Sequence, residues 1–299
     1  MSRIFGLGET VLDVVFKDGK PVSSQPGGTA FNALVSLARA GHKVELISEI
    51  GNDQVGNSMV SFLKKNRVGI NWLHRFSTGK TPVALAFLDK ENNASYQVYK
   101  DFPEVRFQIE MPEFRRGDIL LFGSFFAVNP VLRPQVLSLL KKARSRGAFL
   151  IYDPNFRKNH LDGIKIYRPI IEENFALAHL VRGSDEDFQT IYKDISINDA
   201  LKKVCLNGAH AIVTANAEGV HALINGERLY VESDKIDPVS TIGAGDNFNA
   251  GLAYGLASGQ KPISDINFWK EIIKRAIDFS TDVCLSFDNY ISHQFASTL

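Results

Sequence analysis

The sequence has little cysteine and no long hydrophobic run. Only Cys205 and Cys284 occur among 299 residues, each in an apolar, helix-like stretch, which favours buried free thiols over a disulfide or a metal site. No apolar run approaches the roughly 20 residues of a transmembrane helix. Glu9 and Asp13 interrupt the N-terminal segment early, so it lacks the core of a signal peptide. A cytoplasmic location is therefore expected.

The sequence also lacks an excess of either charge. Lys and Arg number 34 and Asp and Glu 33, giving a net charge of +1. The basic residues stand in short pairs, at 64–65, 115–116 and 141–142, which are typical of solvated surfaces. Neither a nucleic acid nor a membrane is expected as a partner. With 44% hydrophobic residues, the chain can bury a large core.

Short apolar segments alternate with amphipathic ones along most of the chain. The pattern predicts strands at 4–7, 44–50, 119–122, 148–152, 177–182 and 211–214, and helices at 28–40, 54–66, 130–146, 185–192, 198–207 and 246–258. Such alternation is typical of an α/β fold: a doubly wound, mostly parallel central sheet with helices on both faces. We expect a single domain over residues 1–299.

Two segments depart from this alternation. Residues 11–23 and 81–99 each alternate apolar and polar side chains about a turn, at 17–20 and at 90–93. Hairpins fit poorly into a parallel core. We expect them to form a small β-sheet lid, from about 11–25 and 81–106, over the carboxyl edge of the main sheet, where ligands of such folds bind.

Gly243, Ala244, Gly245 and Asp246 form the most informative motif. Small residues leave the backbone N–H groups uncovered at a helix start, which is a favourable place for an anion. Asp246 adds a carboxylate that can accept a proton beside that anion, as phosphoryl transfer to a hydroxyl requires. Taken alone, the motif fits equally well an Asp that only caps a helix.

Three N-terminal residues could bind a polyol. Asp13 follows the first strand, Gly28 allows close approach to a helix start, and Asn32 offers both a donor and an acceptor to hydroxyls. Each has a structural alternative, since Asp13 fits a hairpin and Gly28 a turn. These residue types alone do not decide between a sugar-binding and a purely structural role.

Taken together, the segments 26–32, Pro-Gly-Gly-Thr-Ala-Phe-Asn, and 243–246, Gly-Ala-Gly-Asp, resemble the ribokinase-like PfkB carbohydrate kinase family. Residues 50–56, Ile-Gly-Asn-Asp-Gln-Val-Gly, are similar to another motif of that family. The resemblance implies ATP-dependent transfer to a primary or anomeric sugar hydroxyl. It implies that Asp246 is the catalytic base and that residues 243–245 form an anion hole. Asp13, Gly28 and Asn32 would then bind the sugar.

The resemblance extends to a second sugar-side motif and to the nucleotide half. Residues 153–157, Asp-Pro-Asn-Phe-Arg, resemble a segment of fructokinase-like members, which implies that Arg157 contacts the phosphate or product. Thr214, Gly219 and Thr241, together with Gly243 and Gly245, would bind ATP. Because of the 153–157 segment, fructose is the leading substrate.

Four departures from the family pattern lie in the nucleotide half. Ser240 stands where members commonly carry an Asp that holds a monovalent cation, which puts potassium activation in doubt. The usual Asn-x-x-Glu near magnesium appears as Ser184-Asp185-Glu186-Asp187, leaving Asp187 to act on Mg²⁺ through water. Asn216 replaces a usual glycine, and residues 280–289 lack the adenine-side pattern. ATP still requires Mg²⁺ to offset its charge.

Several alternatives stay open. Ribose, 2-keto-3-deoxygluconate or a nucleoside could replace fructose, and a catalytically weak, sugar-binding regulatory homologue is a different class. A dinucleotide-binding dehydrogenase is disfavoured, because Gly6 and Gly8 lack the third glycine, where Val11 stands. Lid edges often pair, which makes a homodimer plausible.

Overall fold

The computed structural model describes residues 2–89, 94–259 and 261–299, and it contains two sheets. The large sheet has nine strands in the order β13-β12-β11-β10-β9-β8-β1-β4-β5. Its strands are β1 (Ile4–Leu7), β4 (Val44–Gly51), β5 (Gly69–Phe76), β8 (Ile119–Gly123), β9 (Phe149–Asp153), β10 (Leu180–Ser184), β11 (His210–Thr214), β12 (Val220–Ile224) and β13 (Glu227–Val231). All neighbours from β5 to β11 are parallel, and only β12 and β13 are antiparallel. The predicted, mostly parallel sheet is confirmed.

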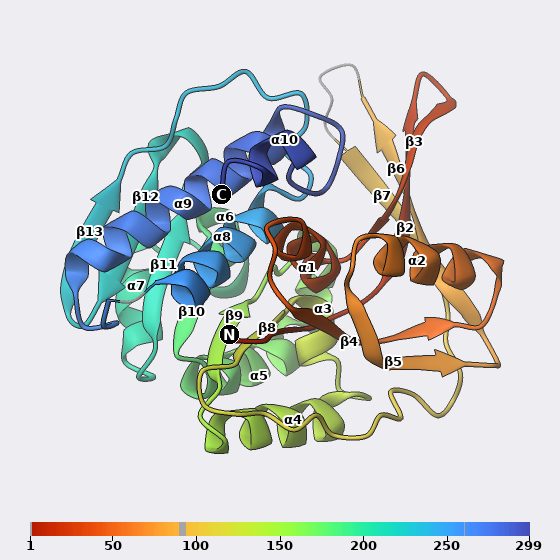
Figure 1. Ribbon diagram of the computed structural model, residues 1–299, viewed down its shortest axis with the longest axis horizontal. Helices are drawn as coiled ribbons and strands as arrows, with labels where there is room; N and C mark the ends of the chain where they lie inside the picture. Colours follow the sequence, from red (N-terminus) through yellow and green to blue (C-terminus); the bar gives the residue numbers. More distant parts are fainter. Residues whose placement is uncertain (1, 90–93, 260) are drawn as a thin grey trace.

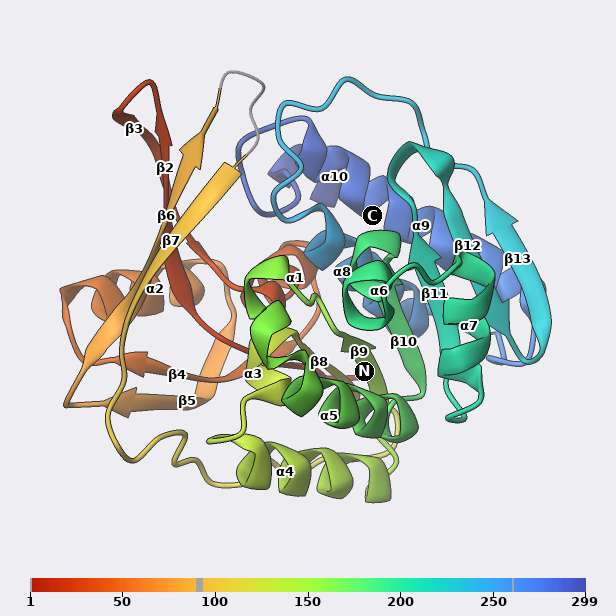
Figure 2. The same cartoon turned by 180° about the vertical axis from the view of Figure 1, so that it is seen from behind.

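Helices cover both faces of this sheet because its strands are apolar on both sides. One layer contains α1 (Thr29–Arg39), α2 (Gln54–Lys65), α8 (Ala244–Ser258) and α9 (Ile266–Cys284), with short α10 (His293–Ala296) beside them. The other contains α3 (Ser124–Val128), α4 (Arg133–Ser145), α5 (Ile164–Leu177), α6 (Asp185–Tyr192) and α7 (Ile197–Cys205). Figures 1 and 2 show these two layers from opposite sides. No helix in the described ranges combines the length and apolar character needed to cross a bilayer.

Side chains of the central strands alternate between the two layers, as a pleated strand requires. In β8, Ile119 and Leu121 pack with α1 and α8, whereas Leu120 and Phe122 pack with α4 and α5. The doubly wound arrangement therefore follows from uninterrupted apolar strands flanked by amphipathic helices.

The four-stranded sheet is the predicted lid. It consists of β2 (Val11–Lys17), β3 (Lys20–Gly27), β6 (Lys80–Leu88) and β7 (Ala94–Asp101), in the order β3-β2-β6-β7. Asp18 and Gly19 have positive φ angles of 51° and 73°, as the tight turn of a hairpin requires. The second predicted turn, at 90–93, lies outside the described residues. In Figure 1 the lid rises as a separate blade beside α1 and α2.

The sequence pattern misplaced several element boundaries. The strand predicted at 177–182 is β10 (Leu180–Ser184), because Leu177 still belongs to α5. The helix predicted from 130 begins at Arg133, and the helix predicted from Asp246 begins two residues earlier, at Ala244. Helices α5 and α9 were not predicted; α5 contains Pro169, a helix breaker. Both cysteines are free, but Cys205 is only half-buried, which corrects the expectation of two buried thiols.

Candidate active site

The carboxylate of Asp246 meets the side chain of Asn32 where α8 and α1 both begin. Asn32 Nδ2 donates a 2.7 Å hydrogen bond to Asp246 Oδ2. No side chain caps α8 within the described chain, and the N-cap position is Gly243. Asp246 is therefore directed toward Asn32, which favours the functional interpretation over the capping one. The side chain of Asn32 is buried, and its Oδ1 has no hydrogen-bond partner among the described residues.

The surroundings of Asp246 suit a base that works near neutral pH. Burial raises the pKa of Asp246 to about 7, helped by the negative charge of Asp153, while the Asn32 bond and the charges of Arg157 and Arg182 act in the opposite direction. A carboxyl with a pKa near the working pH can both accept and release a proton.

Asp13, on β2 of the lid sheet, lies close enough to Asp246 for the two charges to interact. Burial, together with the nearby negative charge of Asp246, raises the pKa of Asp13 to about 7. The interaction places the two carboxyl groups in one site, although Asp13 comes from the lid sheet and Asp246 from helix α8. The prediction that Asp13 stands at the lid junction agrees with its position in β2.

Glycine at positions 27 and 28 permits the chain to pass close to this site. A Cβ on Gly27 would collide with Oδ2 of Asp13, and a Cβ on Gly28 would collide with the carbonyl oxygen of Glu9. Gly28 also has φ 127°, a conformation that other residues avoid. These glycines bring the start of α1, and so Asn32, next to Asp13.

The predicted anion hole is the first turn of α8. Gly243 has φ 81°, in the left-handed region, and a Cβ there would come within 3.1 Å of the Asn289 carbonyl oxygen. The amides of Gly245 and Asp246 lie where a helix leaves N–H groups without intrahelical acceptors. The Ala244 amide is engaged with the Thr241 carbonyl through a long 3.3 Å bond. Among the described residues, the amides of Gly243 and Gly245 donate to no other backbone group, so both are available to an anion.

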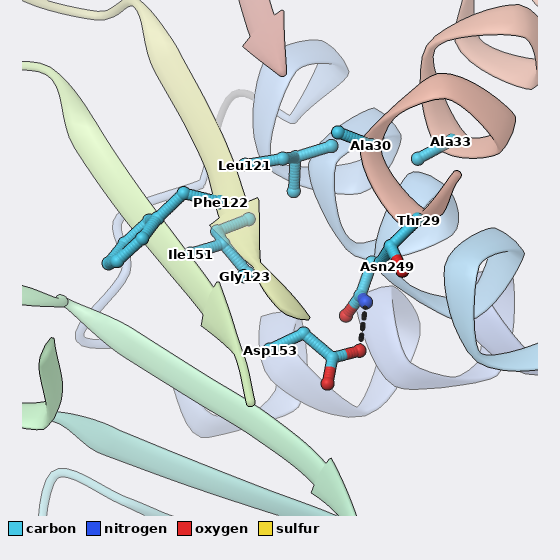
Figure 3. Close-up of a pocket in the computed structure, with 9 residues that line it drawn as sticks. All are labelled: Thr29, Ala30, Ala33, Leu121, Phe122, Gly123, Ile151, Asp153 and Asn249. Carbon is cyan, nitrogen blue, oxygen red and sulfur yellow. Dashed lines mark hydrogen bonds between the residues drawn. The ribbon is translucent and has the colours of Figure 1, made fainter. Parts of the chain in front are cut away.

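Asp153 organises the segment that carries Arg157. Its Oδ1 accepts a 2.9 Å hydrogen bond from the Asn155 amide, and Asn155 Nδ2 donates to Thr29 Oγ1 at 2.7 Å. Its Oδ2 accepts a 2.6 Å bond from Asn249 Nδ2, which Figure 3 shows beside Thr29. A cavity of about 10 Å³, space for one water molecule, lies between these residues and the sheet.

Arg157 is exposed, and its positive charge acts on Asp246 and on Asp187. Arg157 therefore lies near these two carboxyl groups, and it forms no ion pair with another side chain of the described residues. A contact of Arg157 with a phosphate or a product stays a prediction.

Arg182 belongs to the site although sequence reasoning missed it. Its guanidinium donates to Asp153 Oδ2 at 3.0 Å and to Thr214 Oγ1 at 2.5 Å. The only signal in the sequence is a charged residue inside an apolar strand, Leu180–Ser184, where burial without a partner would be costly.

The residues predicted to bind the nucleotide lie in three segments: the end of β11, the turn before β12 and the segment leading into α8. Thr214 ends β11 and accepts the hydrogen bond from Arg182, which joins it to the carboxylate cluster. Thr241 is exposed just before α8. Gly219 precedes β12 with φ 89°, and a Cβ there would come within 2.9 Å of the Tyr230 ring. Packing thus accounts for Gly219 without a ligand.

Asp187 caps α6 rather than facing outward. Its Oδ2 accepts from the amide and the hydroxyl of Ser184, at 2.8 and 2.7 Å, in a reciprocal capping box. Burial and the charge of Asp153 raise the pKa of Asp187. Over the described residues, no three His, Cys, Asp or Glu side chains gather as a metal site.

Known proteins with similar sequences are carbohydrate kinases. The fructokinase of Vibrio alginolyticus is 26% identical over 255 residues, covering 84% of this chain and 83% of that protein. The fructokinase of Klebsiella pneumoniae is 27% identical over 262 residues, with 86% and 85% covered.

Solved structures show the same fold. A fructokinase from Vibrio cholerae, in a form with fructose, ADP and potassium ion bound, matches with a TM-score of 0.87 at 22% identity, covering 99% of this chain and 98% of that one. An aminoimidazole riboside kinase from Salmonella enterica matches with a TM-score of 0.85 at 21% identity, with the same shares covered. The model of the pfkB family carbohydrate kinases matches residues 1–266. The chain therefore belongs to the pfkB family of carbohydrate kinases and is a phosphotransferase.

Proposed function

We propose that this protein transfers the γ-phosphate of ATP to a sugar hydroxyl, with Asp246 as the base and fructose as the leading substrate. The observation that carries the proposal is the hydrogen bonding of the Asn32 side chain. Its amide nitrogen is bonded to Asp246, while its buried Oδ1 has no partner among the described residues. A buried acceptor without a partner is costly unless a ligand donor completes it. A sugar hydroxyl bound there would lie beside the base.

The reaction then follows from the arrangement of the side chains. Asp13 and Asn32 orient the sugar, and Asp246 takes the proton of the reacting hydroxyl as its oxygen forms a bond to the γ-phosphorus. The bond from that phosphorus to the β,γ-bridging oxygen breaks, and ADP leaves with the electron pair. The Gly245 amide and the dipole of α8 stabilise charge on the transferred group.

The residues present fit a nucleotide that arrives with its metal. Mg²⁺ usually keeps several waters and binds nucleotide phosphates with few protein carboxylates, so a dedicated cage of carboxylates is unnecessary. Bound Mg²⁺ would offset the phosphate charge. We infer that Asp187 supports it through water, since Oδ2 is committed to Ser184 and only the other oxygen is left for that role. Thr214 and Thr241 stay proposed contacts of the nucleotide.

Fructose is proposed from two sources. The first is the Asp153–Arg157 segment, whose Asx turn holds Arg157 near the carboxylates. The second is the pair of bacterial fructokinases at 26–27% identity. The riboside kinase with a similar fold makes ribosides the principal competing class.

A panel of acceptors tests the proposal. Fructose, ribose, 2-keto-3-deoxygluconate and nucleosides are each incubated with ATP and Mg²⁺, and ADP release is followed. Asp246→Ala serves as the blank, and Asp199→Asn, an exposed aspartate on α7, is the matched control. We expect fructose to give the highest kcat/KM in the wild type and in Asp199→Asn. Sugar binding without turnover would support the regulatory alternative instead.

A homodimer through the lid is a further part of this proposal. Phe16 stacks on Phe87 with ring centroids 5.2 Å apart, yet Phe87 is 40% exposed and Tyr99 54% exposed. Exposed aromatic rings on the sheet that closes the site favour pairing of two lids. Sedimentation of the protein with and without Phe87→Ser tests the homodimer.

A cytoplasmic location stays a prediction, consistent with two free thiols.

A further inference from the structure

Arg182 is a buried cation at the centre of the site with two defined partners. It is 7% exposed and projects from β10, between β9 and β11. Nη1 donates to Asp153 Oδ2, and Nη2 donates to Thr214 Oγ1. The guanidinium thus links the carboxyl ends of three neighbouring strands.

The same guanidinium lies against the first turn of α8. A Cβ placed on Gly245 would be 2.7 Å from Arg182 Nη1, so the two groups are in close contact as they stand. The guanidinium carbon is also 5.3 Å from the ring centroid of Phe248, two residues beyond Asp246. Arg182 therefore lies beside both the proposed anion hole and the proposed base.

Asp153 explains why a cation is needed at this position. It is buried at the end of β9, and its negative charge makes both Asp246 and Asp187 harder to ionise. A buried carboxylate needs a charged or hydrogen-bonding partner. Arg182 and Asn249 are the side chains that bond to Asp153 Oδ2.

We propose that Arg182 is a positioning residue for the transfer, which compensates the charge of Asp153 so that Asp246 can ionise at physiological pH. The inference rests on the proposed function of Asp246 but assigns a separate role to a residue that need not touch the substrate. Arg182 acts through Asp246, and its removal should change the pH at which the enzyme works more than its affinity for sugar.

The charged groups around Asp246 set the sign of the effect. Asp13 on β2 and Asp153 on β9 oppose ionisation of Asp246, while Arg157 and Arg182 favour it. Loss of Arg182 leaves two carboxylates against one exposed arginine. The pKa of Asp246 should then rise, and the acid limb of the kcat/KM profile should move to higher pH.

Three variants test the proposal against wild type in pH–rate profiles. In Arg182→Gln the acid limb should move up by about one pH unit, the scale of a nearby opposite charge. In Arg182→Lys the charge is kept, so most of the shift should disappear. In the double variant Arg182→Gln/Asp153→Asn both charges are removed, and the limb should return toward the wild-type position.

Arg133→Gln is the matched control. Arg133 is also buried, 9% exposed; it donates to the Ala127 carbonyl and Asn174 Oδ1 and pairs with the Glu173 carboxylate, in the helix layer opposite α8. We expect this variant to lose thermal stability with its acid limb unmoved. An unmoved limb in Arg182→Gln, or a double variant shifted as far as the single one, would overturn the proposal.

A carboxyl ¹³C NMR titration separates this proposal from the proposed function. The Asp246 resonance is identified by its loss in Asp246→Asn, and its midpoint is compared between wild type and Arg182→Gln. A higher midpoint in the variant supports the role of Arg182 even if no sugar in the panel is phosphorylated. An equal midpoint contradicts it even in an active kinase. If Arg182→Gln fails to fold, the comparison is made in the Asp153→Asn background: the midpoint should be higher in Arg182→Gln/Asp153→Asn than in Asp153→Asn alone, and equal midpoints would contradict the proposal.

Discussion

Asn32 Nδ2 lies 2.7 Å from Asp246 Oδ2, although the two residues are 214 positions apart in the chain. The bond joins the first turn of α1 to the first turn of α8. It holds the carboxylate at the place where the N–H groups of α8 begin. A proton acceptor and an anion-binding backbone thus share one corner of the site.

The first prediction concerns the base. Asp246→Asn should keep the sugar site but lose turnover, because the amide cannot accept the hydroxyl proton. We expect kcat to fall by roughly 10²–10⁴-fold or more. The sugar dissociation constant, measured by calorimetry, should change little. Turnover retained within tenfold would contradict the assignment.

The second prediction concerns Asn32. Asn32→Ala removes a donor to Asp246 and the buried acceptor that we assign to a sugar hydroxyl. The KM for the sugar should rise by about 10-fold or more, since one hydrogen bond in a buried site contributes about 1–3 kcal/mol. The KM for ATP should change much less. Steady-state kinetics with each substrate varied in turn distinguish the two, and an effect confined to ATP would contradict the placement.

The third prediction concerns pH and stability. The pKa values of Asp13 and Asp246 are both raised to about 7, mainly by burial. For an acid whose folded-state pKa is raised, the stabilising contribution is complete below its unfolded value near 4 and is lost as pH rises through about 7. Both groups therefore weaken the fold at pH 8 relative to pH 5.

Replacing either carboxyl by an amide should remove this loss. Asp13→Asn should melt a few degrees higher than wild type at pH 8, on the order of 1 kcal/mol, with a smaller difference at pH 5. Thermal unfolding at the two pH values measures it. The exposed Asp199→Asn is the control, in which no such pH-dependent gain is expected.

The fourth prediction concerns the backbone of the anion hole. Gly243 and Gly226 have nearly the same φ, 81° and 83°, but a Cβ at Gly226 meets nothing within 4 Å. Alanine at either position should cost about 1 kcal/mol of stability for the left-handed conformation. Only Gly243→Ala should also lower kcat, because its Cβ presses on Asn289 and moves the start of α8. Equal kcat values in the two variants would show that this turn takes no part in transfer.

The fifth prediction concerns monovalent cations. The family resemblance places Ser240 where members commonly carry an aspartate, so the charge that would hold potassium is missing. We expect rates in potassium chloride and sodium chloride to agree within about twofold, because a neutral hydroxyl attracts a cation weakly. Ser240→Asp should increase the preference for potassium. A large activation of the wild type by potassium would contradict this prediction.

The sequence by itself determined the layered α/β fold, the lid and the family. Apolar strands alternating with amphipathic helices, and two hairpin patterns, were enough because each depends on local periodicity. The motif at 243–246 likewise indicated a helix start with a base, since glycine and aspartate act there through the backbone. Boundaries such as the start of β10 were misplaced, because the apolar side chain of Leu177 fits the end of a helix and the start of a strand equally well.

Only the tertiary structure decided which charges surround Asp246. Asp13, Asn32, Asp153 and Arg182 come from four different elements, and their effect on the carboxylate depends on burial and on proximity across the sheet edge. In the sequence Arg182 is a single cation in an apolar strand. Its partners, Asp153 and Thr214, become visible only when parallel strands place their carboxyl ends together, because pairing in a sheet joins residues that no local pattern relates.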